Sequence, residues 1–391
     1  MARLVVPIQC IVPPHMLRHL VEKGDARLRA FALRALTQSA RIRGRREILA
    51  ALPLGVSAGE ERRTIYDGHH GTTLPGILIR GEGDPPSADP AVNEAYDGLG
   101  ATYGFYHDVF ERNSIDNKGL RLDATIHYDT DYDNAFWDGR RMVFGDGDGV
   151  LFVGFTKSLD VIGHELTHGV TQYDAGLEYH DQPGALNESI SDVFGSLVKQ
   201  YALKQDVKEA DWLIGKGILG PDIHGEALRS MKAPGTAYDD PRLGKDPQPA
   251  RMKNYVKTSD DNGGVHINSG IPNHAFCLAA MALGGNAWEE AGKIWYTALR
   301  RFQPTTNFQD AANITAQVAG ELYGAGGSEQ QAVRDAWAQV DIRVAGIRGP
   351  SRKAAKHVLA DTNGSALVAQ LENVVEELQS VAAAFTQSAS H

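Results

Sequence analysis

Cysteine is scarce in this chain of 391 residues, which contains only Cys10 and Cys277. Two cysteines do not make a disulfide framework, so cysteine usage leaves the redox compartment open. The chain also lacks a continuous apolar run of about 18 residues, the length that a membrane-spanning helix needs, and we expect no membrane span. Prolines and a histidine interrupt the short apolar run at the N-terminus. We therefore do not expect a classical signal peptide there.

A net positive charge is confined to the N-terminal segment of the chain. Residues 1–50 carry ten Lys/Arg against three Asp/Glu, a balance of +7. The whole chain has a net charge of −10, so the remaining residues carry −17. Such an acidic body repels the phosphates of nucleic acid, and we expect no nucleic-acid partner. The basic leader could be a nucleic-acid arm or a segment that docks on its own body, and the charge of the body favours docking.

Composition and periodicity divide the chain into four parts, of which the leader at 1–50 is the first. Residues 51–157 are rich in glycine, aspartate, tyrosine and short β-branched runs, which predict a β-rich lobe. Residues 158–345 show helical periodicity, which is strongest over 158–173, 184–203, 268–283, 286–301, 307–323 and 328–339. A linker opens the last part, 346–391, and a heptad pattern over 365–386 predicts an amphipathic helix with a possible helical partner. The predicted fold class is α+β.

Two histidines and a glutamate interrupt the apolar stretch DVIGHELTHGV at residues 160–170. His164 and His168 are four residues apart, so a helix places both side chains on one face. Glu165 is offset by about 100° and would flank a cation that the histidines hold. Zinc peptidases use this arrangement, in which the glutamate takes a proton from water. The motif alone is only suggestive, because it also arises by chance.

A third ligand is offered by GALNESISDVFG at residues 184–195. Catalytic zinc has three protein ligands and an open position. Glu188 and Asp192 are four residues apart on one helix face, so one carboxylate can bind the metal while the other accepts the outer N–H of a ligand histidine. The alternative is a solvated helix face, which the apolar residues flanking the pair disfavour.

A series of longer motifs runs along the chain: TTLPG (72–76), NAFWDG (134–139), RMVFGDGDG (141–149), DVIGHELTHGVTQYDAGLEY (160–179), GALNESISDVFG (184–195), LRSM (228–231) and DNGGVHINSGIPNHAF (261–276). In these motifs and their order the chain resembles the thermolysin family of zinc metallopeptidases, over roughly residues 64–345. The resemblance implies a β-rich N-terminal lobe and an α-helical C-terminal lobe, with the zinc-binding helix at the floor of the cleft. It also implies a zinc-dependent endopeptidase made as a zymogen, which cleaves on the N-terminal side of large hydrophobic residues.

The resemblance assigns a role to each of several residues. One Zn²⁺ would be held by His164, His168 and Glu188, with Asp192 supporting His164. Glu165 would be the general base, His266 and Tyr179 would stabilise the oxyanion, and Asp261 would orient His266. Substrate backbone would be bound by Asn134 and Arg229. The pocket for the residue after the scissile bond would be lined by Phe152, Val161, Ile214 and Leu228, which otherwise read as ordinary core.

Two lysines depart from the family pattern. Lys199 and Lys216 stand where the family's paired calcium site has glutamates, although Asp160 and Asp211 remain. An ammonium group can pair with carboxylates, but it cannot ligate calcium, which takes about six to eight oxygen ligands. We therefore expect a Lys–Asp cluster in place of the double site, and no dependence on calcium.

The leader contains CIVPPHML at residues 10–17 and resembles the short prosegment of protealysin-like members of the family. One hypothesis is that Cys10 binds the zinc. The other is that Cys10, Pro13 and Leu17 together anchor the leader by packing on the body, and the hydrophobic behaviour of free cysteine favours this second hypothesis. The leader would inhibit its own body until it is cut within residues 41–55. The protein would be secreted by a route without a classical signal peptide, with cytoplasmic retention as the alternative.

A function of a different class is a catalytically silent binding or toxin-like module that keeps the fold and docks partners through its C-terminal helix. Intact Glu165 and His266, together with all three ligands, favour the enzyme instead. The expected partners are then peptide or protein substrates and the chain's own prosegment.

Overall fold

The structure is a computed structural model that describes residues 10–29, 32–33 and 61–344. Two predictions fall outside these residues, namely the cut within 41–55 and the amphipathic helix over 365–386.

All the described elements belong to one compact unit, which ends at Ala345. None of the helices described there is both long and apolar enough to cross a membrane.

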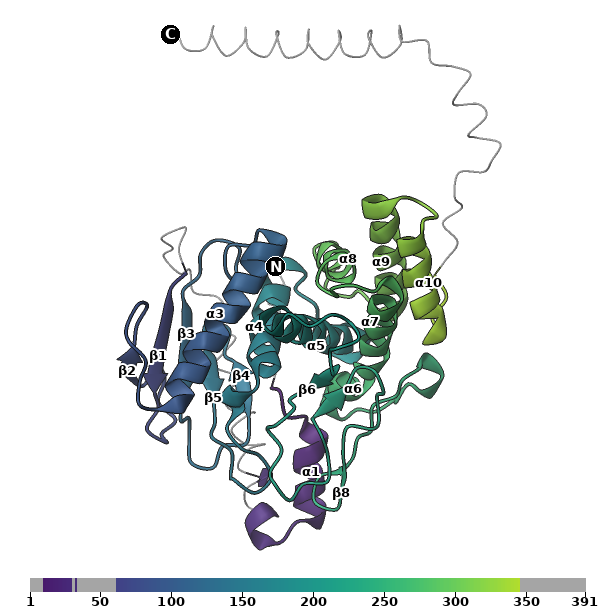
Figure 1. Ribbon diagram of the computed structural model, residues 1–391. Helices are drawn as coiled ribbons and strands as arrows, with labels where there is room; N and C mark the ends of the chain where they lie inside the picture. Colours follow the sequence, from purple (N-terminus) through teal and green to yellow (C-terminus); the bar gives the residue numbers. More distant parts are fainter. Residues whose placement is uncertain (1–9, 30–31, 34–60, 345–391) are drawn as a thin grey trace, which may run out of the picture. The chain divides into compact units, whose positions relative to one another are not determined.

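A five-stranded sheet with a long helix packed against it forms the N-terminal part of the fold (Figure 1). The strands are β1 (Arg63–Asp67), β2 (Ile77–Arg80), β3 (Leu122–Ile126), β4 (Ala135–Trp137) and β5 (Met142–Phe144), in the order β2-β1-β3-β5-β4. β3 runs parallel to both of its neighbours, whereas the two edge strands are antiparallel to theirs. Every residue of β3 is buried, as expected of a central strand. The helix α3 (Pro90–Phe110) begins after Asp89, whose side chain caps it by accepting a hydrogen bond from the Ala91 amide.

The helices α4 (Leu159–Asp174) and α5 (Asp181–Leu203) pack against each other at the centre of the fold (Figure 1). Two glycines allow this close approach. A Cβ on Gly195 would clash with the Asp160 carbonyl, and a Cβ on Gly163 would lie 3.1 Å from the Cα of Gly195. Larger residues at these positions would push the helices apart, so the glycines bring the polar side chains of both helices within reach of one another.

The rest of the body is mainly helical. Its elements are α6 (Asp261–Asn268), α7 (Gly270–Leu283), α8 (Glu290–Leu299), α9 (Phe308–Tyr323) and α10 (Ser328–Gln339), with short 3₁₀ turns at Phe155–Lys157 and Met252–Asn254. Two small two-stranded sheets lie between α5 and α6 in the sequence: β6 (Leu213–Ile214) with β7 (Arg229–Ser230), and β8 (Asp239–Asp240) with β9 (Gly244–Lys245). The helices lie close to the ranges that the periodicity predicts, and the α+β prediction is confirmed.

The leader contributes the helix α1 (Pro14–Lys23). Pro14 stands at its first position, where the missing amide hydrogen costs no helical bond. Met16, Leu17 and Leu20 are buried and belong to the same hydrophobic cluster as the core of the body. The leader is therefore packed onto the body through an apolar face, in addition to any attraction between opposite charges.

Candidate metal centre and active site

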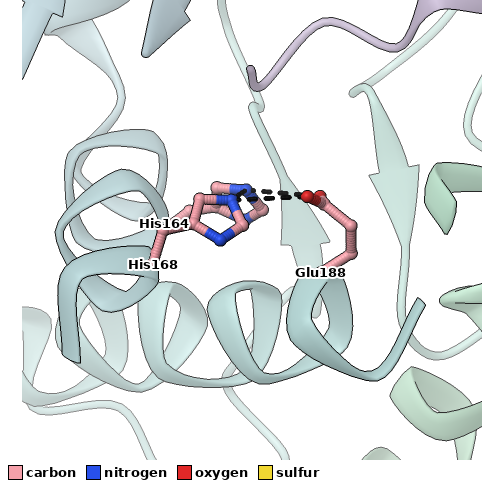
Figure 2. Close-up of side chains that lie close together, drawn as sticks. All are labelled: His164, His168 and Glu188. Carbon is pink, nitrogen blue, oxygen red and sulfur yellow. Dashed lines mark hydrogen bonds and ion pairs between the residues drawn. The ribbon is translucent and has the colours of Figure 1, made fainter. Parts of the chain in front are cut away.

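His164 and His168 direct one nitrogen each toward the same point. Both rings are fully buried, and their Nε2 atoms lie 3.0 Å apart. Glu188 reaches this point from α5, with carboxylate oxygens 3.5 Å from the Nε2 of His164 and 3.4 Å from that of His168 (Figure 2). These three side chains, which we call the histidine cluster, are the one group in the described part of the chain whose geometry could hold a metal ion.

The outer nitrogens of both rings are hydrogen-bonded to α5. Nδ1 of His164 is 2.8 Å from Asp192 Oδ1, and Nδ1 of His168 is 2.8 Å from Asn187 Oδ1 and 2.9 Å from Ser191 Oγ. Acceptors at Nδ1 favour the tautomer that leaves the Nε2 lone pair free for a metal. Sequence analysis missed Asn187 and Ser191. Their signal was their position, one residue before each of the two carboxylates on the same helix.

The donor set of the histidine cluster suits zinc. Two imidazole nitrogens and one carboxylate oxygen are the ligands of many catalytic zinc sites. Glu188 Oε2 is buried and has no hydrogen-bond partner among the described residues. A buried carboxylate oxygen left in this state is costly, and a cation at the meeting point of the three side chains would satisfy it.

Glu165 lies beside the cluster on α4 and is fully buried. Its Oε2 accepts a hydrogen bond of 3.1 Å from the backbone amide of Trp137 on β4. This bond ties the carboxylate to the strand that faces the helix. Glu165 is thus held next to the histidine cluster without belonging to it, as its offset on the helix predicts.

His266 and Tyr179 meet on the other side of Glu188. His266 Nε2 is 3.2 Å from the Tyr179 hydroxyl, which donates a hydrogen bond to Glu188 Oε1. Asp261 holds His266 twice, through Nδ1 at 2.7 Å and through the backbone amide at 2.9 Å. Burial alone would lower the pKa of His266, but the Asp261 and Glu188 carboxylates outweigh burial and raise it to about 9. The ring is therefore suited to donate a proton or a hydrogen bond.

Arg229 is linked to the histidine cluster through Asp192. Its guanidinium donates two hydrogen bonds of 2.8 Å to the two oxygens of this carboxylate, one of which also accepts from Asn273 at 2.8 Å. Burial alone would raise the pKa of Asp192, but Arg229 and His164 hold it well below its usual range. Asp192 therefore stays ionised and fixes both a ligand ring and the guanidinium.

Comparison with known proteins identifies this arrangement. Family models described as "Thermolysin metallopeptidase, catalytic domain" and "Thermolysin metallopeptidase, alpha-helical domain" match residues 61–172 and 175–342. The chain is 49% identical over 344 residues to an "Extracellular metalloprotease" of Pectobacterium carotovorum subsp. carotovorum, which covers 86% of this chain and 97% of the relative. It is also 53% identical over 286 residues to "Protease PrtS" of Photorhabdus sp. (strain Az29), covering 72% of this chain and 76% of the relative.

The chain belongs to the thermolysin family of metallopeptidases. Among solved structures, it is similar to the "Precursor of Protealysin, Metalloproteinase from Serratia proteamaculans", with a TM-score of 0.79 and 51% identity, covering 85% of this chain and 99% of that one. The resemblance to the protealysin type is thereby confirmed, and the chain is a metalloendopeptidase.

In this thermolysin-family chain, backbone carbonyls of the leader contact two of the predicted site residues. The Cys10 carbonyl oxygen is 3.1 Å from His266 Nε2. The Ile11 carbonyl oxygen accepts a hydrogen bond of 3.1 Å from the guanidinium of Arg229. Consecutive carbonyls thus point at the residue expected to stabilise the oxyanion and at the residue expected to bind substrate backbone.

The amides of the leader pair with the segment around β4. The Ile11 amide donates to the Ala135 carbonyl at 3.3 Å, and the Val12 amide donates to Asn134 Oδ1 at 3.0 Å. Cys10 forms an antiparallel bridge with Phe136. Residues 10–12 therefore lie extended along β4 and occupy the two sites expected to bind substrate backbone.

The four predicted pocket residues are all buried: Phe152, Val161, Ile214 and Leu228. They belong to the same hydrophobic cluster as Ile11 of the leader, which is itself fully buried. The Leu228 amide donates to the Ile214 carbonyl at 2.9 Å, which holds these two residues side by side. Their assignment to a substrate pocket stays a prediction.

The side chain of Cys10 packs in a small hydrophobic cluster of its own. The other buried members are Tyr128, Tyr132, Phe136 and Val143. Its thiol does not join the histidine cluster, so it is the carbonyl of Cys10 that reaches the active-site residues.

Lys199 reaches from α5 to the start of α4, where the sequence predicts a Lys–Asp cluster. Its ammonium donates to Asp160 Oδ2 at 2.6 Å, to Asp211 Oδ1 at 3.0 Å and to the Leu213 carbonyl at 2.8 Å. Burial alone would lower the pKa of Lys199, but Asp160 and Asp211 outweigh it and raise the pKa. Lys216 is more exposed and lies 3.6 Å from Asp211. We call Lys199, Asp160 and Asp211 the lysine cluster.

Proposed function

We propose that the histidine cluster binds one zinc ion and that the chain is a zymogen which hydrolyses peptide bonds before large hydrophobic residues. The observation that carries this proposal is the path of residues 10–12. Their amides and carbonyls meet Asn134, Arg229 and His266 as an extended peptide would, and the nitrogen of His266 that contacts the Cys10 carbonyl lies 3.6 Å from Glu188 of the histidine cluster. A site that binds its own leader in this way is built to bind extended peptides.

His164, His168 and Glu188 would hold the zinc, and the bound ion would supply Lewis-acid chemistry, namely polarisation of the substrate carbonyl and acidification of water. Glu165 takes the proton of water, since it is the buried base beside the ligands, and passes it to the leaving nitrogen. His266 and Tyr179 donate to the developing oxyanion, and Asp261 keeps His266 in the orientation and charge state that this needs. Arg229 and Asn134 hold the backbone on the leaving-group side and so fix the bond in place.

The specificity follows from the position of Ile11. Its backbone amide donates to the Ala135 carbonyl and its carbonyl accepts from Arg229, as expected of the residue after the scissile bond. Its side chain is fully buried in the main hydrophobic core, to which Phe152, Val161, Ile214 and Leu228 also belong. An apolar pocket favours a large hydrophobic side chain at that position. The alternative of a catalytically silent binding module is disfavoured, because a module without catalysis would not need Glu165 and His266 beside the proposed ligands.

Latency and export are the remaining parts of the proposal. The leader covers the substrate contacts, so its removal is needed before a substrate can bind, and we propose a cut within residues 41–55. Relatives named as extracellular metalloproteases support secretion of the active form. The proposed route does not use a classical signal peptide.

Replacing Glu165 by Gln tests the catalytic proposal. The amide cannot accept the proton of water, so peptide hydrolysis should fall by about 10² to 10⁴ while zinc content stays at the parental level. The measurement combines hydrolysis of a peptide with a large apolar residue after the scissile bond and metal analysis of the same preparation. Activity within a few-fold of the parent would contradict the assigned mechanism.

The same variant tests the zymogen proposal. N-terminal sequencing of the active parent should find a new terminus within or just after residues 41–55, whereas Glu165→Gln purified alone should keep its leader. An intact leader on fully active enzyme would refute latency, and normal processing of the inert variant would refute self-cleavage.

A further inference from the structure

The contact between α1 and the body contains a histidine that the catalytic mechanism does not use. His15 lies at the second position of α1, and its Nε2 is 2.9 Å from the Tyr238 hydroxyl. The residue as a whole is only partly buried, but its Nδ1 is shielded from solvent and has no hydrogen-bond partner within the described ranges. Protonation would therefore bury an N–H donor without an acceptor, together with a charge.

The groups around this ring oppose a positive charge. Burial is the main cause that lowers the pKa of His15, from 6.5 to about 4. His266 on α6, Arg229 on β7 and Arg18 on α1 lower it further, while Asp261 on α6 raises it. Burial raises the pKa of Tyr238, so this partner stays neutral in mild acid.

A second histidine of α1 lies in a different environment. His19 is one turn further on, and its Nε2 is 3.3 Å from the Pro241 carbonyl oxygen at an exposed site. The carbonyl is an acceptor and the site is exposed to solvent, so His19 serves as the matched control for His15 on the same helix.

We propose that His15 is an acid-sensitive latch, which holds the leader on the body while its ring is neutral and releases the leader when the ring is protonated. The proposal rests on the proposed latency of the leader and adds the condition that ends it. The latch acts through α1, and neither the metal ligands nor Glu165 take part in it.

The direction and size of the effect follow from linkage. The pKa of His15 is about 4 while the leader is docked and near 6.5 once the leader is released. Docking of the leader is therefore strongest above pH 6.5 and weakens as the pH falls from 6.5 to about 4. Each pH unit within the window changes the docking equilibrium about tenfold. Between pH 7 and pH 4.5 docking should therefore weaken by about 50-fold.

The test uses the full chain carrying Glu165→Gln, in which the leader stays attached. Hydrogen exchange of the α1 amides, corrected for the intrinsic rate at each pH, reports how often the helix opens. Protection should fall about 50-fold from pH 7 to pH 4.5 in this parent and in its His19→Gln derivative, but less than about 3-fold in its His15→Gln derivative. The amides of α5 serve as the internal reference for the folded body.

Three results would overturn the latch. These are constant α1 protection in the parent, an equally steep loss in His15→Gln, and a His15 pKa at or above 6.5 when its ring protons are followed by NMR in the intact chain. The NMR titration needs no substitution at His15, so it decides the matter even if His15→Gln fails to dock. Absence of α1 protection at pH 7 would instead refute the proposed latency, and the latch with it.

Discussion

The helix pair α4–α5 carries two polar clusters that are built differently. In the histidine cluster, two ligand nitrogens and the Glu188 carboxylate surround one point, and a buried carboxylate oxygen is left without a hydrogen bond among the described residues. In the lysine cluster, the ammonium of Lys199 already lies between Asp160, Asp211 and a backbone carbonyl. We propose that an ion from solution completes the first cluster, whereas the second contains its own cation.

The difference suggests a proposal about the start of α4. Asp160 is fully buried there, one turn before His164, and it needs a partner of opposite charge. Lys199 provides that charge with its own hydrogen bonds, and we propose that α4 is therefore held at its start without calcium. The proposed chemistry cannot be replaced in this way, because an ammonium group has no lone pair with which to polarise a carbonyl.

The largest stability effect is expected in the lysine cluster. Lys199→Met leaves Asp160 buried without a cation, although Ser158 and the Gly215 amide still bond to it. The free energy of unfolding should fall by about 3 kcal/mol, the lower end for a broken buried pair. Urea unfolding of a Glu165→Gln background, which prevents self-digestion, gives the value.

The matched control pairs Lys199→Met with Asp160→Asn. In this double variant Asp160 no longer carries a buried, unpaired negative charge, so most of the lost free energy of unfolding should be restored. A single variant as stable as its parent, or one that added calcium restores, would contradict the role given to Lys199.

A smaller effect is expected around the histidine cluster. Asn187→Ala removes one acceptor from the Nδ1 of His168, while Ser191 remains in contact. Loss of such a partner usually weakens metal binding about 10- to 100-fold, and the remaining hydroxyl favours the lower end. Competition with a zinc chelator measures the change. Unaltered zinc affinity would mean that Asn187 does not set the orientation of His168.

The smallest effect is expected at His127, a histidine between two carboxylates but outside the metal-binding group. Burial alone would lower its pKa, but hydrogen bonds of 2.8 Å to both Asp89 and Asp146 outweigh burial and raise it. Stability from the charged ring is fully present below the unfolded pKa of about 6.5 and is lost as the pH rises through the raised folded value. These groups are partly exposed, so the loss should be under about 1 kcal/mol.

Unfolding curves from pH 6 to pH 9 for the parent and for His127→Asn test this prediction. The decline in stability with rising pH should be shallower in the variant than in the parent, and the decline that remains in both comes from His266, whose pKa is also raised. Identical slopes would show that the proton on His127 contributes nothing to the fold.

Helical spacing predicted that His164 and His168 share one face, because side chains one turn apart lie on the same side of a helix, and that Glu165 is offset from them. Spacing also placed Glu188 and Asp192 on one face of the next helix, but it left open which carboxylate joins the histidines. The family resemblance selected Glu188, and Glu188 is the carboxylate that groups with the two histidines. The family resemblance, and not spacing, supplied His266 and Tyr179, which come from segments far apart in the chain. The partner of Lys199 on the backbone, the Leu213 carbonyl, was not predictable, since a main-chain acceptor leaves no mark in the sequence.

The contacts of the leader were missed for the same reason. The Cys10 and Ile11 carbonyls form hydrogen bonds whatever side chains these residues carry, so the residue types in the sequence do not predict these bonds. The sequence suggested a role for the thiol of Cys10, whereas in the structure the carbonyl of Cys10 contacts His266. The predicted cut within 41–55 and the helix over 365–386 stay predictions.

The metal content of the intact chain tests the central claim most directly. Purified protein is equilibrated with both zinc and calcium, passed through a desalting column and analysed for bound metal by native mass spectrometry. The account predicts one zinc ion and no calcium for the parent, and the loss of that zinc in His168→Ala. Bound calcium, or a chain that retains no zinc while it hydrolyses peptides, would contradict the account.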